Sequence, residues 1–267
     1  FLIKDDGFDL WCKLENIENG VALFSNKISE PMDMTTQMVG KLANDIVTSL
    51  KVETKQDIMK APTTNAETYE LYLRAKNIYY KRENTDDTEI AQGLLNKAIE
   101  LDDSLISARL LLGQSYKEIG DHDKAMEIYS SALTKSEELG DNLWIGRSLR
   151  KIGNVYFVKD NNDMASDYWE RSLAIAEELG DKHGMGASIH NIGIVYYNKG
   201  DYEKAEEYLE KSLAIQKEIG LKELELTTTT NLYLAYKHLG KEYDKTEILR
   251  IIKETEKIEF ELNYALY

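Results

Sequence analysis

The sequence predicts a mainly α-helical protein, an α–α superhelix of stacked helix pairs that follows a small α/β segment at the N-terminus. The first observation is a repeat, because Gly113, Gly153 and Gly193 are separated by steps of 40 residues. Other residues recur at the same spacing: Tyr116, Tyr156 and Tyr196; Ala125, Ala165 and Ala205; Leu133, Leu173 and Leu213. The second observation is that no proline, the residue that most disrupts helices, follows Pro62. Self-similarity at a fixed period is the signature of a solenoid.

Two strands and one helix are expected in the first 60 residues. Apolar and polar residues alternate between Phe8 and Leu14, which is typical of a strand, and residues 21–28 form a second candidate. Residues 34–52 have the spacing of an amphipathic helix. Its apolar stripe consists of Met38, Leu42, Ile46 and Leu50. We therefore expect residues 1–60 to be a truncated α/β domain.

Residues 186–220 show how each unit divides into two antiparallel helices. Apolar residues at helical spacing run from Ile189 to Tyr196, and Gly200 and Asp201 then interrupt the pattern. Glycine suits the left-handed position that ends a helix, and aspartate caps the amide groups that open the next one.

Small residues at fixed positions have a steric explanation. We expect Gly193 and Ala205 to lie where the two helices of a pair approach most closely. Tyr196 and Leu209 are expected to fill the space on either side. A larger side chain at either small position would push the helices apart, because interiors are close-packed.

The repeats divide residues 65–267 into five units. Their expected bounds are 67–105, 106–145, 146–185, 186–225 and 226–267. The last unit is expected to be degenerate or a cap, because Tyr233 replaces the repeat glycine and Lys245 the alanine. Terminal repeats diverge because one of their faces meets water.

These units resemble the tetratricopeptide repeat (TPR). The matching residues are Leu149, Ile152, Gly153, Tyr156, Ala165, Trp169 and Ser172 in one unit, and Ile189, Ile192, Gly193, Tyr196, Ala205, Leu209 and Ser212 in the next. The preceding unit matches less fully, because Arg109 stands at its first position. The 40-residue period exceeds the usual 34 and is similar to that of Pins-type adaptors, kinesin light chains and bacterial Rap-type regulators. The resemblance implies a helical superhelix that binds protein partners.

A second resemblance concerns the N-terminal segment. Residues 6–11 and the stretch from Gln37 to Leu50 are similar to the end of a TolB-like α/β domain. Cys12 departs from the serine of that family, and no catalytic residue is carried over. The resemblance implies a bacterial protein in which this domain precedes TPRs. Such chains frequently carry a class III adenylate or guanylate cyclase domain, or a DNA-binding module, further upstream.

The acidic composition disfavours several classes of partner. The formal net charge is −15, so we expect no nucleic acid partner, which needs clustered Lys and Arg, and no anionic membrane surface. No apolar run approaches the roughly 18 residues of a membrane span. Cys12 is the only cysteine, which excludes an internal disulfide. The chain opens without Met or a signal-peptide pattern, so we expect a cytoplasmic fragment of a longer protein.

In such a stack the first helix of each pair lines the concave groove, where we expect the ligand. The candidate binding residues are Gln114, Lys117, Arg147, Arg150, Lys151, Asn154, Phe157, His190, Asn191, Ile194, Tyr197, Asn198, Asn231 and Lys237. Asparagine amides can donate to and accept from a peptide backbone. Arg147, Arg150 and Lys151 form a basic group suited to a ligand carboxylate. The alternative is that these are merely solvated helix positions.

The sequence predicts no catalytic residue, no cofactor and no metal site in this fragment. Its four histidines lack metal-ligand spacing, and Ser172 and Ser212 occupy a packing position. The predicted function is a protein–protein interaction module that binds a peptide or partner segment and serves as a regulatory or signalling scaffold. Two alternatives stay open: the C-terminal regulatory region of a class III adenylate or guanylate cyclase, and a homo-oligomerisation platform.

Overall fold

A computed structural model describes residues 2–4, 7–15, 22–31 and 66–242, together with residues 244, 246, 249, 250 and 253. The chain forms two compact units, Phe1–Ala108 and Arg109–Tyr267. The helix predicted over residues 34–52 lies outside the described residues.

The first unit holds a three-stranded antiparallel sheet. Its strands are β1 (Leu2–Lys4), β2 (Gly7–Glu15) and β3 (Ala22–Pro31), in the order β1-β2-β3. Leu10 lies opposite Ile28 in the register of β2 and β3. The strand predicted over residues 8–14 is therefore confirmed, and so is the one predicted over residues 21–28 in its described part, residues 22–28, whereas β1 was not predicted.

The same unit contains the first helix pair, α2 (Ala66–Lys81) and α3 (Thr85–Leu101). The two helices lie side by side, and Ala75 of α2 and Ala91 of α3 are fully buried. Asn84 caps α3 by accepting a hydrogen bond from the Asp87 amide (3.0 Å). This cap satisfies one of the amide groups that have no partner within the helix.

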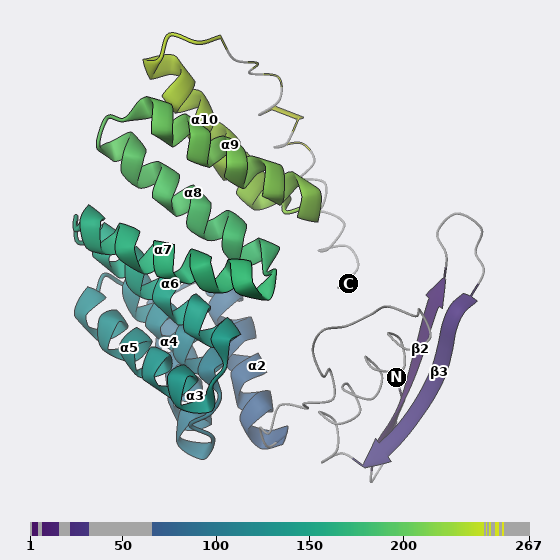
Figure 1. Ribbon diagram of the computed structural model, residues 1–267. Coiled ribbons are helices and arrows are strands. Elements are labelled where there is room, and N and C mark those ends of the chain that lie inside the picture. The colour runs from purple at the N-terminus through teal and green to yellow at the C-terminus, as the bar shows by residue number, and fades with distance from the viewer. Residues whose placement is uncertain are drawn as a thin grey trace. The chain divides into compact units, whose positions relative to one another are not determined.

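The second unit is a series of antiparallel helices in which each of α5 to α9 packs against the next (Figure 1). The helices are α4 (Ile106–Glu118, with its first residues in the other unit), α5 (His122–Leu139), α6 (Asn142–Val158), α7 (Asn162–Leu179), α8 (Lys182–Asn198), α9 (Tyr202–Ile219) and α10 (Lys222–His238). The predicted class, a mainly α solenoid of helix pairs with a small N-terminal segment that contains strands, is confirmed.

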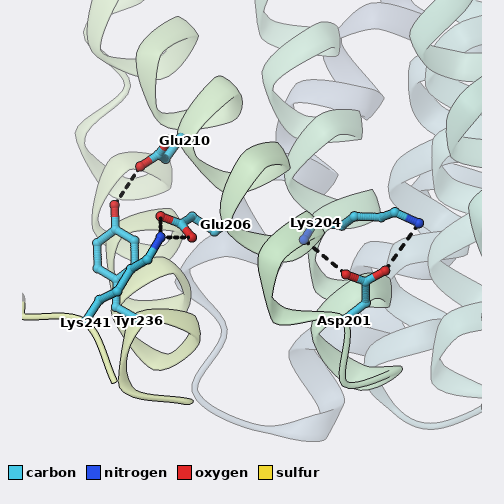
Figure 2. Close-up of polar contacts among 6 residues, drawn as sticks. All are labelled: Asp201, Lys204, Glu206, Glu210, Tyr236 and Lys241. Carbon is cyan, nitrogen blue, oxygen red and sulfur yellow. Dashed lines mark hydrogen bonds and ion pairs between the residues drawn. The ribbon is translucent and has the colours of Figure 1, made fainter. Parts of the chain in front are cut away.

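The turn between α8 and α9 shows why the helices end where they do. Gly200 adopts a left-handed backbone with φ of +78°. The Asp201 carboxylate then accepts a hydrogen bond from the Lys204 backbone amide (3.2 Å). It also forms an ion pair with the Lys204 ammonium group (3.3 Å; Figure 2). The predicted helix end at Gly200 and cap at Asp201 are therefore confirmed.

Glycines at the repeat position allow the two helices of a pair to approach closely. A Cβ atom on Gly153 would lie only 2.6 Å from Trp169 Nε1, and one on Gly193 would lie 3.0 Å from Leu209 Cγ. Ala205 is fully buried at the same interface. The expected close approach at Gly193 and Ala205 is present, and it is the bulky residue sixteen positions after each glycine that needs the space.

Candidate functional site

The first helices α4, α6, α8 and α10 carry all fourteen predicted binding residues, and we call the surface that these residues form the first-helix face. Twelve of the fourteen are half-buried, and Asn198 and Lys237 are exposed. Partial burial of so many polar groups requires hydrogen-bond partners, because a buried polar group without one is destabilising.

Hydrogen bonds join the polar side chains of one first helix to those of the next. Lys151 Nζ donates to Gln114 Oε1 (2.9 Å), which links α6 to α4. Asn191 Nδ2 donates to Asn154 Oδ1 (3.1 Å), which links α8 to α6. Both bonds join residues 37 positions apart in the sequence. The two bonds are related by one 40-residue repeat, so equivalent positions form the same contact twice.

A third contact links α8 to α10. The buried hydroxyl of Thr228 lies 2.8 Å from His190 Nδ1. Burial lowers the pKa of His190 to about 4, so its imidazole is neutral at neutral pH. Thr228 was not among the predicted residues, because a threonine within a run of four gives no sign of a partner 38 positions away.

The amide groups of Asn154 and Asn191 have defined orientations. Trp169 Nε1 also donates to Asn154 Oδ1 (3.0 Å), and an indole N–H can only donate, so the Asn154 oxygen must face it. Asn191 turns its nitrogen to the same oxygen. Within the described part of the chain, Asn154 Nδ2 and Asn191 Oδ1 have no hydrogen-bond partner. The pair therefore presents an unused amide nitrogen on Asn154 and an unused amide oxygen on Asn191.

The basic residues of α6 lie on successive turns of one helix face, at the i, i+3 and i+4 positions of Arg147, Arg150 and Lys151. The Arg147 guanidinium lies over the Trp144 ring, 4.8 Å from its centroid. Burial lowers the pKa of Lys151 to about 8, helped by the charges of Arg150 and Lys117. Burial and the neighbouring Arg147 lower the pKa of Arg150 in the same way.

The apolar members of the set have mixed surroundings. Phe157 packs on Trp169, with ring centroids 5.6 Å apart, and so belongs in part to the core. Tyr197 makes edge contacts with the rings of Tyr202 and His238. Ile194 is half-buried on α8.

The remaining predicted residues are less well connected. The side chains of Asn198, Asn231 and Lys237 form no hydrogen bond or ion pair with any other described residue. The structure thus joins Gln114 to Lys151 and Asn154 to Asn191, whereas it leaves these three at the margin of the first-helix face.

Other chemical centres are not evident in the described residues. Ser172 Oγ donates to the Gly146 carbonyl (2.8 Å) and Ser212 Oγ to the Gly186 carbonyl (2.7 Å), so both hydroxyls serve packing. No group of three or more His, Cys, Asp or Glu side chains in this part of the chain could hold a metal ion. None of the described helices is long and apolar enough to cross a membrane.

Comparison with known families identifies the repeat. Residues 144–218 match one family model described as tetratricopeptide repeat, and residues 106–134 match another with the same description. The chain therefore contains tetratricopeptide repeats, as the sequence resemblance implies. TPRs form scaffolds for interactions between proteins, and that is the class of protein to which this fold corresponds.

Solved structures agree with this fold. A putative kinesin light chain of Podosopora anserina with nearly identical TPR-like repeats is 16% identical, with 73% of this chain and 97% of that chain covered and a TM-score of 0.50. BtubC (BKLC) from P. vanneervenii is 19% identical, with 74% and 90% covered and a TM-score of 0.51. At such low identity the likeness shows the fold alone. No curated protein matches the chain.

Proposed function

We propose that this protein is a non-enzymatic interaction module that holds an extended peptide or partner segment along the first-helix face, in the concave groove of the superhelix. It would act as a regulatory or signalling scaffold. The observation that carries the proposal is the Asn154–Asn191 pair, whose unused donor and acceptor lie on adjacent first helices.

An extended peptide is the ligand that this pair suits. Its backbone offers alternating N–H and C=O groups, which match one donor and one acceptor regardless of side-chain sequence. Neighbouring helices are spaced by about 10 Å and an extended chain rises by about 3.3 Å per residue, so roughly six residues would cross from α6 to α10. Each hydrogen bond contributes only about 1 kcal/mol net, so side-chain contacts must supply the rest.

A double substitution tests the site. A random peptide display library would be selected on the wild-type protein and on the Asn191→Ala, Arg150→Ala variant. We expect the variant to lose at least about tenfold in peptide capture, with unchanged helical circular dichroism. The matched control is Arg171→Ala with Glu178→Ala, two exposed residues of α7. Undiminished capture by the groove variant would place the ligand elsewhere.

A second candidate function is the regulatory region of a class III adenylate or guanylate cyclase. It is favoured by the resemblance of residues 6–11 to the end of a TolB-like domain. The sequence upstream in the parent gene tests it. A catalytic domain with two metal-binding aspartates would support the cyclase, and any other upstream domain would exclude it.

A third candidate is self-association through the last helices. An open pocket of about 460 Å³ lies against α9 and α10, with Leu213, Leu232 and Tyr233 among its lining residues. The lining also includes charged residues, among them Glu210 and Lys217, and a surface of mixed polarity at the end of a repeat stack can pair with a second copy. Light scattering over a concentration series tests this, because a constant monomer mass would exclude it.

A further inference from the structure

Cationic side chains of α6 and of the neighbouring first helix α4 lie on the first-helix face. We call Lys117 of α4 and Arg147, Arg150 and Lys151 of α6 the basic cluster. The three residues of α6 lie on successive turns of one helix face, and Lys151 donates to Gln114, which lies three residues before Lys117 on α4. This concentration of positive charge is unusual in a chain with 48 acidic and 33 basic residues.

The members of the basic cluster lack a carboxylate partner. Among the described residues, none of them lies within the 4.0 Å of an acidic side chain that defines an ion pair. The two carboxylates that act on them, Glu118 and Asp181, are engaged elsewhere. Glu118 accepts from Gln114 Nε2 (3.1 Å), and Asp181 accepts from the Gly184 amide to cap α8 (3.1 Å).

Lysines elsewhere in the same unit behave differently. Lys159 pairs with Asp123 (2.5 Å) and Lys199 with Asp163 (2.8 Å), in each case across neighbouring repeats. Carboxylates therefore pair with lysines in register along the stack, whereas no carboxylate of the described residues forms an ion pair with the basic cluster. Half-buried cations without an anionic partner are costly, which favours an anion supplied by a ligand.

The number of cations without an anionic partner indicates which kind of anion the cluster would bind. None of the four cations of the basic cluster forms an ion pair within the described residues, whereas a single ligand carboxylate would neutralise only one of them. A phosphate monoester carries −1.5 to −2 charges at neutral pH. We propose that the basic cluster binds a phosphorylated serine or threonine of the partner segment, an inference that rests on the peptide-binding function proposed above.

The geometry of α6 suits this ligand. Arg147 and Arg150 lie one turn apart, so their planar guanidinium groups can each address different phosphate oxygens. Arg147 is held over Trp144, and Lys151 is held by Gln114, which limits the entropy lost on binding. Asn154 follows Arg150 by four residues on the same helix face, so its free amide N–H can bond to backbone next to the phosphorylated residue.

Fluorescence anisotropy with three peptide pools tests the proposal. The pools share degenerate flanking positions and carry phosphoserine, glutamate or serine at the centre. We expect the phosphoserine pool to bind at least about tenfold more tightly than the other two. The Arg147→Gln, Arg150→Gln variant is expected to abolish that preference, so that it binds the phosphoserine and serine pools with equal affinity. Arg171→Gln on α7 is the matched control and is expected to change nothing.

The outcomes separate the two proposals. Equal binding of the serine and phosphoserine pools, with both weakened by Asn191→Ala, would overturn the phosphate inference and leave the peptide groove intact. Equal binding of the glutamate and phosphoserine pools would overturn it in favour of an acidic segment. Failure of all three pools to bind would count against both the inference and the proposed function.

Discussion

The contact between α7 and α8 and the contact between α9 and α10 occupy equivalent places one repeat apart, yet they are built from different side chains. The equivalent residues are Ala176 and Gln216, Met185 and Glu225, and Ile189 and Thr229. The later set is polar, and all three of its members are at most 1% exposed. The repeat therefore keeps its backbone arrangement while apolar packing gives way to buried polar groups.

Not all of these buried polar groups are satisfied. Glu225 forms ion pairs with Lys222 (3.1 Å) and Arg250 (3.6 Å). Gln216 Oε1 and Thr229 Oγ1 have no hydrogen-bond partner within the described residues. Each unsatisfied buried group costs about 1–3 kcal/mol, so the α9–α10 contact is weaker than its counterpart.

Polar contacts at the opposite end of α10 offset part of this loss (Figure 2). Lys241 pairs with Glu206 (2.5 Å), and the Tyr236 hydroxyl donates to Glu210 (2.7 Å). Burial and the Glu210 carboxylate raise the pKa of Tyr236, so its hydroxyl keeps the proton that it donates. The groups of these pairs are largely near the surface, where an ion pair contributes at most about 1 kcal/mol.

The difference between the two contacts shows that stability is graded along the stack. Each repeat touches only its neighbours, so a weak contact lowers the stability of one end without unfolding the rest. We therefore expect α10 to open before α6, α7 and α8. Since Asn231 lies on α10, ligand contacts there would form on the least stable part of the groove.

The largest effect is expected when apolar side chains of the α7–α8 contact are replaced by the polar residues found at the equivalent positions of the α9–α10 contact. Ala176→Gln with Met185→Glu should destabilise the α7–α8 contact by about 3 kcal/mol, because it replaces apolar packing with a buried charge. Urea unfolding followed by tryptophan fluorescence measures this loss. Arg171→Gln, an exposed change on α7, is the control. A loss below about 1 kcal/mol would show that this position tolerates polarity as well as its counterpart does.

The reverse exchange should strengthen the end of the stack. Glu225→Met with Gln216→Ala is expected to stabilise α10 by about 2 kcal/mol, because replacing buried ion pairs with apolar packing is often stabilising. Native-state hydrogen exchange of the α10 amides measures the gain. Thr230→Met, an exposed change on the same helix, should give none. Unchanged or lower protection in the double variant would contradict the comparison.

The start of α10 offers a smaller gain. Asp181 caps α8, whereas Leu221 in the same place forms no side-chain cap. Leu221→Asp should stabilise α10 by about 1 kcal/mol, and Asp181→Leu should destabilise α8 by a similar amount. Thermal unfolding of both variants, read by circular dichroism, checks whether the two changes have opposite signs.

The smallest effect is expected for the surface ion pair that follows the C-terminal end of α10. Lys241→Ala removes the ion pair with Glu206, and because the lysine is half exposed the loss should be about 0.5 kcal/mol. The loss should also disappear in 1 M salt, where surface charges are screened. Unfolding in low and high salt measures both points. A loss above about 2 kcal/mol would mean that surface ion pairs, and not the buried side chains, provide most of the stability of the α9–α10 contact.

Local chemistry explains why much of the fold could be predicted. Gly200 and Asp201 act within a few residues of themselves, so the helix end and the cap follow from sequence alone. The spacing of Gly153 and Gly193 likewise predicts close helix contacts. The first-helix positions of the site residues could be predicted as well, since they follow from the repeat. The hydrogen bonds between these residues could not be predicted, because nothing in the sequence around His190 indicates that its side chain contacts Thr228.

What the sequence by itself determined is the stack of helix pairs, the acidic character and the polar set on the first helices. These depend on the 40-residue period and on residue type, which need no knowledge of distant contacts. Only the tertiary structure decided how the Asn154 amide is turned, which cations near Arg150 lack a carboxylate and which buried groups at Gln216 and Thr229 go unsatisfied. The physical reason is that hydrogen bonds and ion pairs depend on distances of a few ångströms between residues that are often nearly forty positions apart.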